Sequence, residues 1–448
     1  MTTEQRLCSF DLNERTNALR ELAGAGQPPD GSQRGNVNMH IHSFFSYNAE
    51  GWSPTRIAWE CAKRGLDAAG LIDFDVLDGL PEFFAAGERL GLRALVGVES
   101  RVFYAEFADK EIDSPGEPGV HYIDGIGFCR LPEPGTQAAA GLQRWRDSAQ
   151  KRNVELVARI NLQVQEIAID YLAQVIPLSP GKCPTERHII AAYVDQAQSR
   201  LEGGDLAAFW SRVLGRSADE TAGLLKNRPK MEEVVRSRFA KRGGFGYIQP
   251  TAETFPAMEE FTAWVRACGA IPMESWLDGT SSGESEAEAL LECSMAKGCR
   301  AFSIIPDRNW NLADEKARAL KVAKLRKVVA LADARHLPLN VGTEMNRLGL
   351  PFADDLRGPV LREFAESFHR GAMVLIGHTL CGRLAGFGYL SAAAEAEFPS
   401  FEKRNRFFAS VGELPPLTTA VADRLREAGE EKALGMVRES VRARAWKR

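Results

Sequence analysis

Short apolar segments alternate with helical patterns along most of this chain, and that alternation limits the folds open to it. Seven segments have the length and composition of buried strands, and helical patterns separate most of them: residues 36–42, 68–72, 93–99, 121–128, 269–273, 301–305 and 337–341. Alternating strands and helices with short buried strands favour a parallel sheet. The sequence therefore predicts an α/β fold, and periodicity alone leaves a closed barrel and an open doubly wound sheet as alternatives.

The alternation stops in the middle of the chain, where helical patterns dominate and strand-like sequence is scarce. A break of this kind predicts a helical insertion within the α/β unit. The predicted organisation is an N-terminal extension at residues 1–35, an α/β core formed by residues 36–134 and 262–380, a helical insertion at 135–261, and a C-terminal helical segment at 381–448.

Composition narrows the class of protein. The 448 residues carry a net charge of −4 with a pI near 6.1, which argues against nucleic acid as the main partner because such binding relies on a concentrated basic surface. The eight cysteines form no CxxC pair and are expected to be reduced thiols. No stretch approaches the ~20 apolar residues needed to span a bilayer. These features predict a soluble cytoplasmic protein that acts on a small molecule.

Two of the seven histidines, His40 and His42, stand one residue apart at the end of the first predicted strand. Side chains at i and i+2 of a strand point to the same face, so both imidazoles can converge on one point. Neutral imidazole binds Zn, Mn or Fe, and a carboxylate commonly completes such a site. HxH pairs also occur by chance in loops, so the pair alone leaves metal binding and a structural role as equal alternatives.

Further polar residues stand at or near the ends of later predicted strands. Asp73 follows the second strand, Glu99 the third and Glu344 the seventh, while His121 opens the fourth. Each has a structural alternative, such as pairing of either glutamate with an arginine. As a group near one rim of the sheet, they favour a metal site.

Several of these residues lie in motifs that resemble a known family. The chain carries His40-Ile-His-Ser, then a segment at residues 65–79 that ends in Leu-Asp-Gly, then Gly-Val-Glu99, His121, and a last strand segment at residues 337–346. In this order, the motifs resemble those of the PHP (polymerase and histidinol phosphatase) family over roughly residues 36–130 and 265–346. The resemblance implies a (β/α)7 TIM-like barrel, here with a helical insertion, and up to three divalent metal ions.

The departures from the family pattern fall together. Phe74 and Asn346 stand where the resemblance implies histidines that share one metal, so that site is expected to be lost. Trp276 replaces a histidine of a second site, which would also use Glu99 and His121. The metal ligands implied for this chain are therefore His40, His42, Glu99 and Glu344, with His121 as a fifth if a second ion binds. One or two Zn, Mn or Fe ions are expected.

Other residues are candidates for substrate binding or catalysis next to the metal. Arg308 and Asn309 follow the sixth predicted strand, and Arg347 follows the seventh. A planar guanidinium at the rim suits a phosphate or carboxylate of the substrate, and a structural ion pair is the equal alternative. Asp73 is a candidate to orient a catalytic water, or to cap a helix.

These features lead to a functional hypothesis. The chain is predicted to be a metal-dependent hydrolase, foremost a phosphoesterase-like one that uses a metal-activated water at the C-terminal mouth of the barrel. Its partner would be a small molecule, with phosphorylated compounds as the first candidates. Two alternatives remain: a single-metal hydrolase or lyase that acts on a carbonyl group, and a non-catalytic PHP-like protein that binds a metal or ligand.

Overall fold

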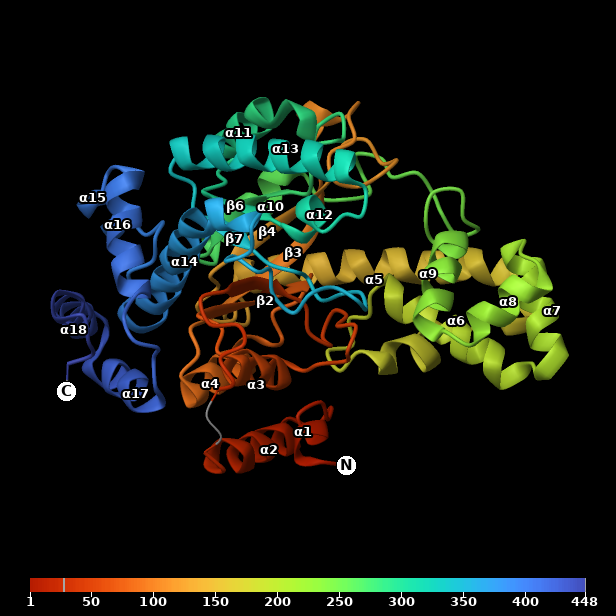
Figure 1. The fold of residues 1–448 in the computed structure, drawn as a ribbon, viewed down its shortest axis with the longest axis horizontal. Coiled ribbons are helices and arrows are strands. Elements are labelled where there is room, and N and C mark those ends of the chain that lie inside the picture. Colours follow the sequence, from red (N-terminus) through yellow and green to blue (C-terminus); the bar gives the residue numbers. More distant parts are fainter. Residues whose placement is uncertain (27–28, 448) are drawn as a thin grey trace.

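One seven-stranded sheet forms the centre of the molecule (Figure 1). The computed structural model describes residues 1–26 and 29–447, so Gln27 and Pro28 of the predicted extension and Arg448 of the predicted C-terminal segment lie outside it. The strands follow in chain order: β1 (Val37–Ile41), β2 (Ala68–Phe74), β3 (Ala94–Phe103), β4 (Val120–Ile126), β5 (Ile271–Trp276), β6 (Ala301–Ile304) and β7 (Leu339–Val341). All seven coincide with predicted strands to within a few residues.

The sheet curls until its first and last strands meet. A bridge joins Ile41 to Glu344, the Glu344 amide donates to the His40 carbonyl at 2.8 Å, and the His42 amide donates to the Glu344 carbonyl at 2.9 Å. The result is a nearly closed, barrel-shaped sheet in a mixed α/β fold. This closure decides between the two predicted alternatives in favour of the barrel.

One strand departs from the predicted parallel arrangement. β4 runs antiparallel to both β3 and β5, whereas the other neighbouring strands are parallel. Parallel neighbours are usually joined by a crossover helix, whereas the connection at residues 104–119 between β3 and β4 contains only one short 3-10 turn, Ala105–Phe107. The chain returns through this loop without a crossover helix, so the expectation of a fully parallel sheet was wrong at this strand.

Helices cover the outside of the barrel. Their bounds are α1 (Thr3–Arg6), α2 (Leu12–Gly24), α3 (Pro54–Arg64), α4 (Leu80–Leu90), α10 (Met258–Ala267), α11 (Ala287–Ala296), α12 (Asp307–Trp310) and α13 (Glu315–Ala334). Two local residues fix the start of α3: Ser53 caps the helix by accepting a hydrogen bond from the Arg56 amide, and Pro54 occupies the first turn. Across the described residues, no helix is both long and apolar enough to cross a membrane.

Between β4 and β5 the described chain forms helices and no strand. Five α-helices of this stretch precede α10 and extend to one side of the barrel in Figure 1: α5 (Gln137–Gln163), α6 (Glu186–Arg200), α7 (Gly203–Leu214), α8 (Ala218–Leu225) and α9 (Arg228–Phe239). They share a hydrophobic cluster of their own, in which Tyr193, Trp210 and Phe239 are fully buried. The segment thus has a core distinct from that of the barrel.

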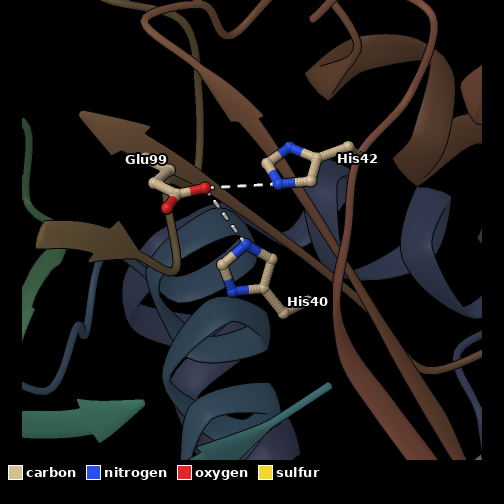
Figure 2. Close-up of side chains that lie close together, drawn as sticks. All are labelled: His40, His42 and Glu99. Atoms are coloured by element: carbon tan, nitrogen blue, oxygen red, sulfur yellow. Dashed lines mark ion pairs between the residues drawn. The ribbon is translucent and has the colours of Figure 1, made fainter. Parts of the chain in front are cut away.

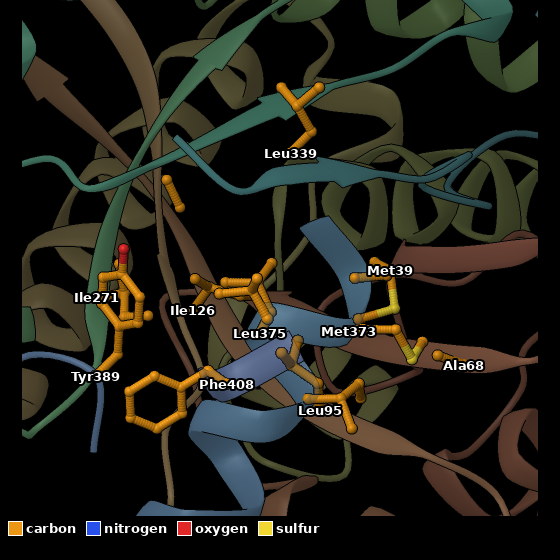
Figure 3. Packing of buried hydrophobic residues seen from close by; sticks show 14 of the residues in the cluster. Met39, Ala68, Leu95, Ile126, Ile271, Leu339, Met373, Leu375, Tyr389 and Phe408 are labelled. Carbon is orange, nitrogen blue, oxygen red and sulfur yellow. The ribbon is translucent and has the colours of Figure 1, made fainter. Parts of the chain in front are cut away.

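The C-terminal helices close one end of the barrel. They are α14 (Ala365–Ala385), α15 (Ala392–Glu397), α16 (Phe401–Gly412), α17 (Thr419–Ala428) and α18 (Glu430–Ala443). Figure 3 shows Met373 and Leu375 of α14 packed among buried side chains that include Met39, Ala68 and Leu95 of β1, β2 and β3. α14 approaches so closely that a Cβ at Gly371 would meet the Leu339 carbonyl at 2.2 Å. This end lies at the strand starts, opposite the end where His42 and Glu344 follow β1 and β7.

Candidate metal centre

Three buried side chains converge at the mouth of the barrel (Figure 2). His40 is the fourth residue of β1, His42 follows the end of that strand, and Glu99 lies on β3. Nε2 of His40 lies 3.4 Å from Glu99 Oε2, and Nε2 of His42 lies 3.2 Å from the same oxygen. The two histidines are therefore on one face of the strand, as their i, i+2 spacing predicts.

The convergence leaves ligand atoms without hydrogen bonds. Both ring nitrogens of His40, Nε2 of His42 and Oε2 of Glu99 are buried and have no hydrogen-bond partner among the described residues, although the atoms lie close together. Buried polar atoms are rarely left unsatisfied in proteins. Two imidazoles and a carboxylate are a donor set that Zn, Mn and Fe accept. The residues present therefore fit a divalent transition metal.

A hydrogen-bond network fixes the orientation of His42. The Ser46 hydroxyl donates to Asp73 Oδ1 at 2.6 Å and lies 3.3 Å from His42 Nδ1, so its oxygen is free to accept a hydrogen bond from the N–H of that nitrogen. Asp73 also accepts hydrogen bonds from the amide and hydroxyl of Ser43. This arrangement places the ring proton on Nδ1 and leaves the lone pair of Nε2 facing Glu99, which is the form that binds metals.

The charges around this group are unusually dense. Although burial opposes it, the carboxylates of Asp124 and Glu99 raise the pKa of His40 to about 9. Burial likewise opposes the change at Glu99, whose pKa the two histidines lower to about 2. Burial raises the pKa of Asp124 to about 7. The group thus holds more negative than positive charge, and a bound cation would supply the charge that a proton on His40 otherwise provides.

Asp124 is a candidate residue that sequence reasoning missed. It is 1% exposed and accepts a hydrogen bond from Ser275 at 2.9 Å, and its second oxygen, Oδ1, has no hydrogen-bond partner in the part of the chain that the structure describes. Asp124 pairs directly with Glu99 across β3 and β4, so both side chains point to the inside of the barrel. The residues of β4 alternate between two faces, with His121, Ile123 and Gly125 on one and Tyr122, Asp124 and Ile126 on the other. This alternation identifies Asp124 as an inward-facing residue once the antiparallel pairing of β4 with β3 is known.

His121 lies away from this group. In the register of β3 and β4 it pairs with Val102, three residues beyond Glu99, and therefore points to the opposite face of the sheet. There its Nδ1 lies 3.1 Å from Asp113 Oδ2 and its Nε2 lies 3.1 Å from Glu274 Oε1, and all three side chains are buried. The structure thus separates His121 from the other predicted ligands and encloses it between two carboxylates.

Glu344 lies beside the group but faces Arg308. The Arg308 guanidinium donates to both Glu344 oxygens, at 3.1 and 3.3 Å, and Asn346 donates to Oε2 at 2.9 Å. Burial opposes the change, but the charge of Arg308 lowers the pKa of Glu344. Two residues predicted for separate roles, one as a metal ligand and one as a substrate clamp, are therefore partners in one ion pair at the rim.

The other predicted site residues have different surroundings. Asn309 is fully buried and donates to the carbonyls of Leu277 and Ile305, and Arg347 is exposed; neither lines the cavity described below. Asp73 faces the two serines and likewise does not line that cavity. Phe74 stacks on the His42 ring, with centroids 4.8 Å apart.

A cavity of about 850 Å³ opens above the group. Barrel residues, including His40, Glu99 and Asp124, form its base, and residues of the helical segment 135–261 form the facing wall. Its volume is within the range of small-molecule sites in proteins. Both Arg308 and Glu344 line it, so a ligand in the cavity would meet the ion pair as well as the histidine group.

Comparisons with known proteins give partial similarities. No protein-family model matches the chain. A stretch of 104 residues, 22% of this chain, is 32% identical to the error-prone DNA polymerases of Mycobacterium bovis and Mycobacterium tuberculosis, and spans 9% of their length. Among solved structures, the chain is similar to an amidohydrolase from Chromobacterium violaceum (TM-score 0.48, 20% identity, 74% of this chain and 96% of that one). It is also similar to a candidate metal-dependent phosphoesterase from Bifidobacterium adolescentis (TM-score 0.46, 16% identity, 76% and 98%).

Proposed function

We propose that this chain is a metal-dependent hydrolase that acts on a small molecule, with phosphoesters as the first substrate class. One observation carries the proposal: the converging atoms of His40, His42 and Glu99 are buried and have no hydrogen-bond partners among the described residues, and His40 and Glu99 line the base of a cavity. Burying polar atoms without partners costs free energy, and a bound cation that coordinates them would offset that cost. Zn, Mn and Fe are the candidate ions.

The residues around the cavity would have different roles in the reaction. When bound, a divalent cation lowers the pKa of a coordinated water and polarises the bond under attack. Asp124 lines the same cavity, its Oδ1 has no hydrogen-bond partner among the described residues, and an ionised carboxylate there would favour a cation. Arg308, fixed by Glu344, presents a permanent positive charge at the rim, where it would stabilise an anionic transition state such as that of phosphoester hydrolysis.

Hydrolysis assays test the proposal. The full-length protein, treated with a chelator and then reloaded separately with Zn, Mn or Fe, is expected to hydrolyse p-nitrophenyl phosphate faster than p-nitrophenyl acetate, each rate corrected for the free metal. Faster acetate hydrolysis would favour the carbonyl alternative. Stoichiometric metal binding with no hydrolysis of either ester would favour the non-catalytic alternative. A protein that binds none of the metals and hydrolyses neither ester would refute the proposed function.

The network behind His42 leads to a separate prediction. Ser46→Ala removes the hydroxyl that links His42 Nδ1 to Asp73, so the imidazole loses the contact that fixes its orientation. Metal affinity is expected to fall by roughly 10–100-fold, as is typical for partners of a metal-binding histidine. Competition with a chromogenic chelator measures it. The matched control is Ser148→Ala on α5, outside this network, and equal affinities in both variants would contradict the role given to Ser46.

A further inference from the structure

The wall opposite the metal group is strongly basic. Within residues 135–261, the side chains that line the cavity include six basic groups, Arg152, Arg159, Arg187, Arg236, Lys241 and Arg242, and two acidic ones, Glu155 and Glu186. The base of the cavity has the opposite character, because Glu99, Asp124 and Glu344 gather there. A ligand that fills the cavity would therefore meet a cation-binding end and an anion-binding end.

Two arginines of this cavity share one aromatic ring. The guanidinium carbon of Arg101, on β3, lies 4.4 Å from the centroid of Phe255, and that of Arg152, on α5, lies 4.7 Å from the same centroid. Stacking on an aromatic face holds a guanidinium in place while its N–H groups remain able to bind a ligand. Strand β3 and helix α5 thus place two cations at one position of the cavity.

Nearby carboxylates neutralise only part of the positive charge of Arg101 and Arg152. Arg152 donates to the Ser148 hydroxyl at 2.7 Å and makes no ion pair within the described chain. Arg101 has one carboxylate partner, Glu117, at 3.8 Å. Burial, together with the charge of Arg101, lowers the pKa of Arg152 to about 10. Asp75 and Glu186 are further carboxylates near Arg101, and Asp75 accepts a hydrogen bond from Ser100 at 2.6 Å.

The neighbouring basic residues more than neutralise Glu186. Arg236 and Lys241 both pair with Glu186, at 2.6 and 3.0 Å, so these three groups together keep one positive charge. That excess charge lines the same wall as Arg152. An anion bound at the arginine pair would therefore gain from the wider field as well as from direct hydrogen bonds.

We propose that Arg101 and Arg152 form an anion-binding subsite that holds a phosphate or carboxylate group of the substrate, remote from the bond that is hydrolysed. This inference rests on the proposed function, because the reacting end of the same molecule would lie at His40, His42 and Glu99. Guanidinium groups bind both kinds of anion through paired, charge-assisted hydrogen bonds.

The strand geometry sets the distance between the two ends. Glu99 and Arg101 are alternate residues of β3 and point to the same face, roughly 7 Å apart along the strand. Rings lie between them: Phe74 stacks on His42, Tyr122 packs against Phe74 with centroids 6.1 Å apart, and Arg101 lies over Tyr122. The substrate expected here has two polar ends separated by a short apolar or ring-shaped part.

The first experiment uses chelator-treated, full-length protein, so its outcome does not depend on the metal. Calorimetric titration with inorganic phosphate, and separately with acetate, is carried out on the wild type and on the Arg101→Gln and Arg152→Gln variants. Each variant is expected to bind the preferred anion roughly tenfold more weakly or worse, since each loses a charge-assisted contact. The matched control is Arg212→Gln on α7, whose exposed side chain pairs with Glu166 outside the cavity; it is expected to bind as the wild type does.

The better-bound anion identifies the group that the subsite takes. Equal affinities in the wild type and both cavity variants would overturn the subsite, as would the absence of binding of either anion to the wild type. Thermal unfolding of each variant shows whether it is folded. If one of the two arginine variants is unfolded, the other still tests the subsite.

A second titration separates the subsite from the metal centre. Propane-1,3-diphosphonate is expected to bind the metal-loaded wild type at least tenfold more tightly than phosphate, because it reaches both ends of the cavity. If the arginine variants weaken phosphate binding but the diphosphonate gains nothing from added metal, the subsite stands and the proposed hydrolase centre fails. If added metal tightens diphosphonate binding and the metal-loaded wild type and both arginine variants bind it equally tightly, the centre stands and the subsite fails.

Discussion

Replacing both His40 and His42 by alanine is expected to abolish stoichiometric metal binding. The two imidazoles supply two of the three converging ligand atoms, and Glu99 alone offers one carboxylate to the cation. Loss of direct ligands is expected to exceed the roughly 10–100-fold loss that follows removal of a ligand's supporting partner. Elemental mass spectrometry of the purified protein measures it, with a wild-type content near one Zn, Mn or Fe ion per chain. Hydrolytic activity is expected to disappear with the metal.

The control for this prediction is another histidine of the chain. His369 lies on α14, is 40% exposed and pairs with Asp67 at 3.4 Å, so His369→Ala is expected to keep the wild-type metal content. Circular dichroism confirms that both variants are folded. The assignment of the metal site would be contradicted if the wild type bound none of the three metals after reconstitution. It would also be contradicted if the double variant retained the wild-type metal content.

His121→Gln is expected to lower the free energy of unfolding by about 3–5 kcal/mol, the usual loss when one partner of a buried charged group is removed. His121 is fully buried between Asp113 and Glu274, and both Glu274 oxygens have no hydrogen-bond partner among the described residues. Without the imidazolium, two carboxylates remain in a space of low polarity. Urea denaturation measures the change, and a loss below about 0.5 kcal/mol, typical of surface positions, would contradict this account.

The double variant His121→Gln/Glu274→Gln provides the matched control. Since it removes a carboxylate together with the imidazole, it is expected to be more stable than His121→Gln alone, and the difference measures the coupling between the two side chains. No recovery of stability would show that His121 acts through packing rather than through charge.

The same group gives a pH dependence with a definite sign. Burial opposes the change, but Asp113 and Glu274 raise the pKa of His121 well above 6.5. The stabilisation is therefore complete below pH 6.5 and is lost as the pH rises through the folded-state pKa. Burial also raises the pKa of Glu274, which acts in the same direction. Wild-type stability is expected to fall with rising pH in this window, and His121→Gln should lack that component.

The sequence was informative wherever function and fold depend on local spacing. The seven strands, the capped start of α3 and the convergence of His40 with His42 all follow from short patterns that the chain carries in one place. A strand alternates its side chains, and a helix cap needs only the next three residues. These features required no knowledge of distant contacts.

Features that depend on strand direction or on distant contacts could not be predicted in this way. The register of β4 against β3 pairs Asp124 with Glu99, so Asp124 rather than His121 shares a face with Glu99, and no local pattern encodes that register. The pairing of Glu344 with Arg308 joins the segment after β7 to helix α12, 36 residues earlier in the chain. Arg101 and Arg152 meet at Phe255 from a strand and a helix of different parts of the chain. Each of these depends on tertiary packing that periodicity does not describe.

The position of α14 has a consequence for synthesis on the ribosome. The barrel strands have all been translated by Val341, but the helix that covers their starting ends spans Ala365–Ala385. Until that helix emerges, apolar side chains such as Met39 and Leu95 lack their cover, and a half-made barrel is exposed to aggregation. Folding of the barrel is therefore completed late in translation, and fragments that end before α14 are poor candidates for expression as independent units.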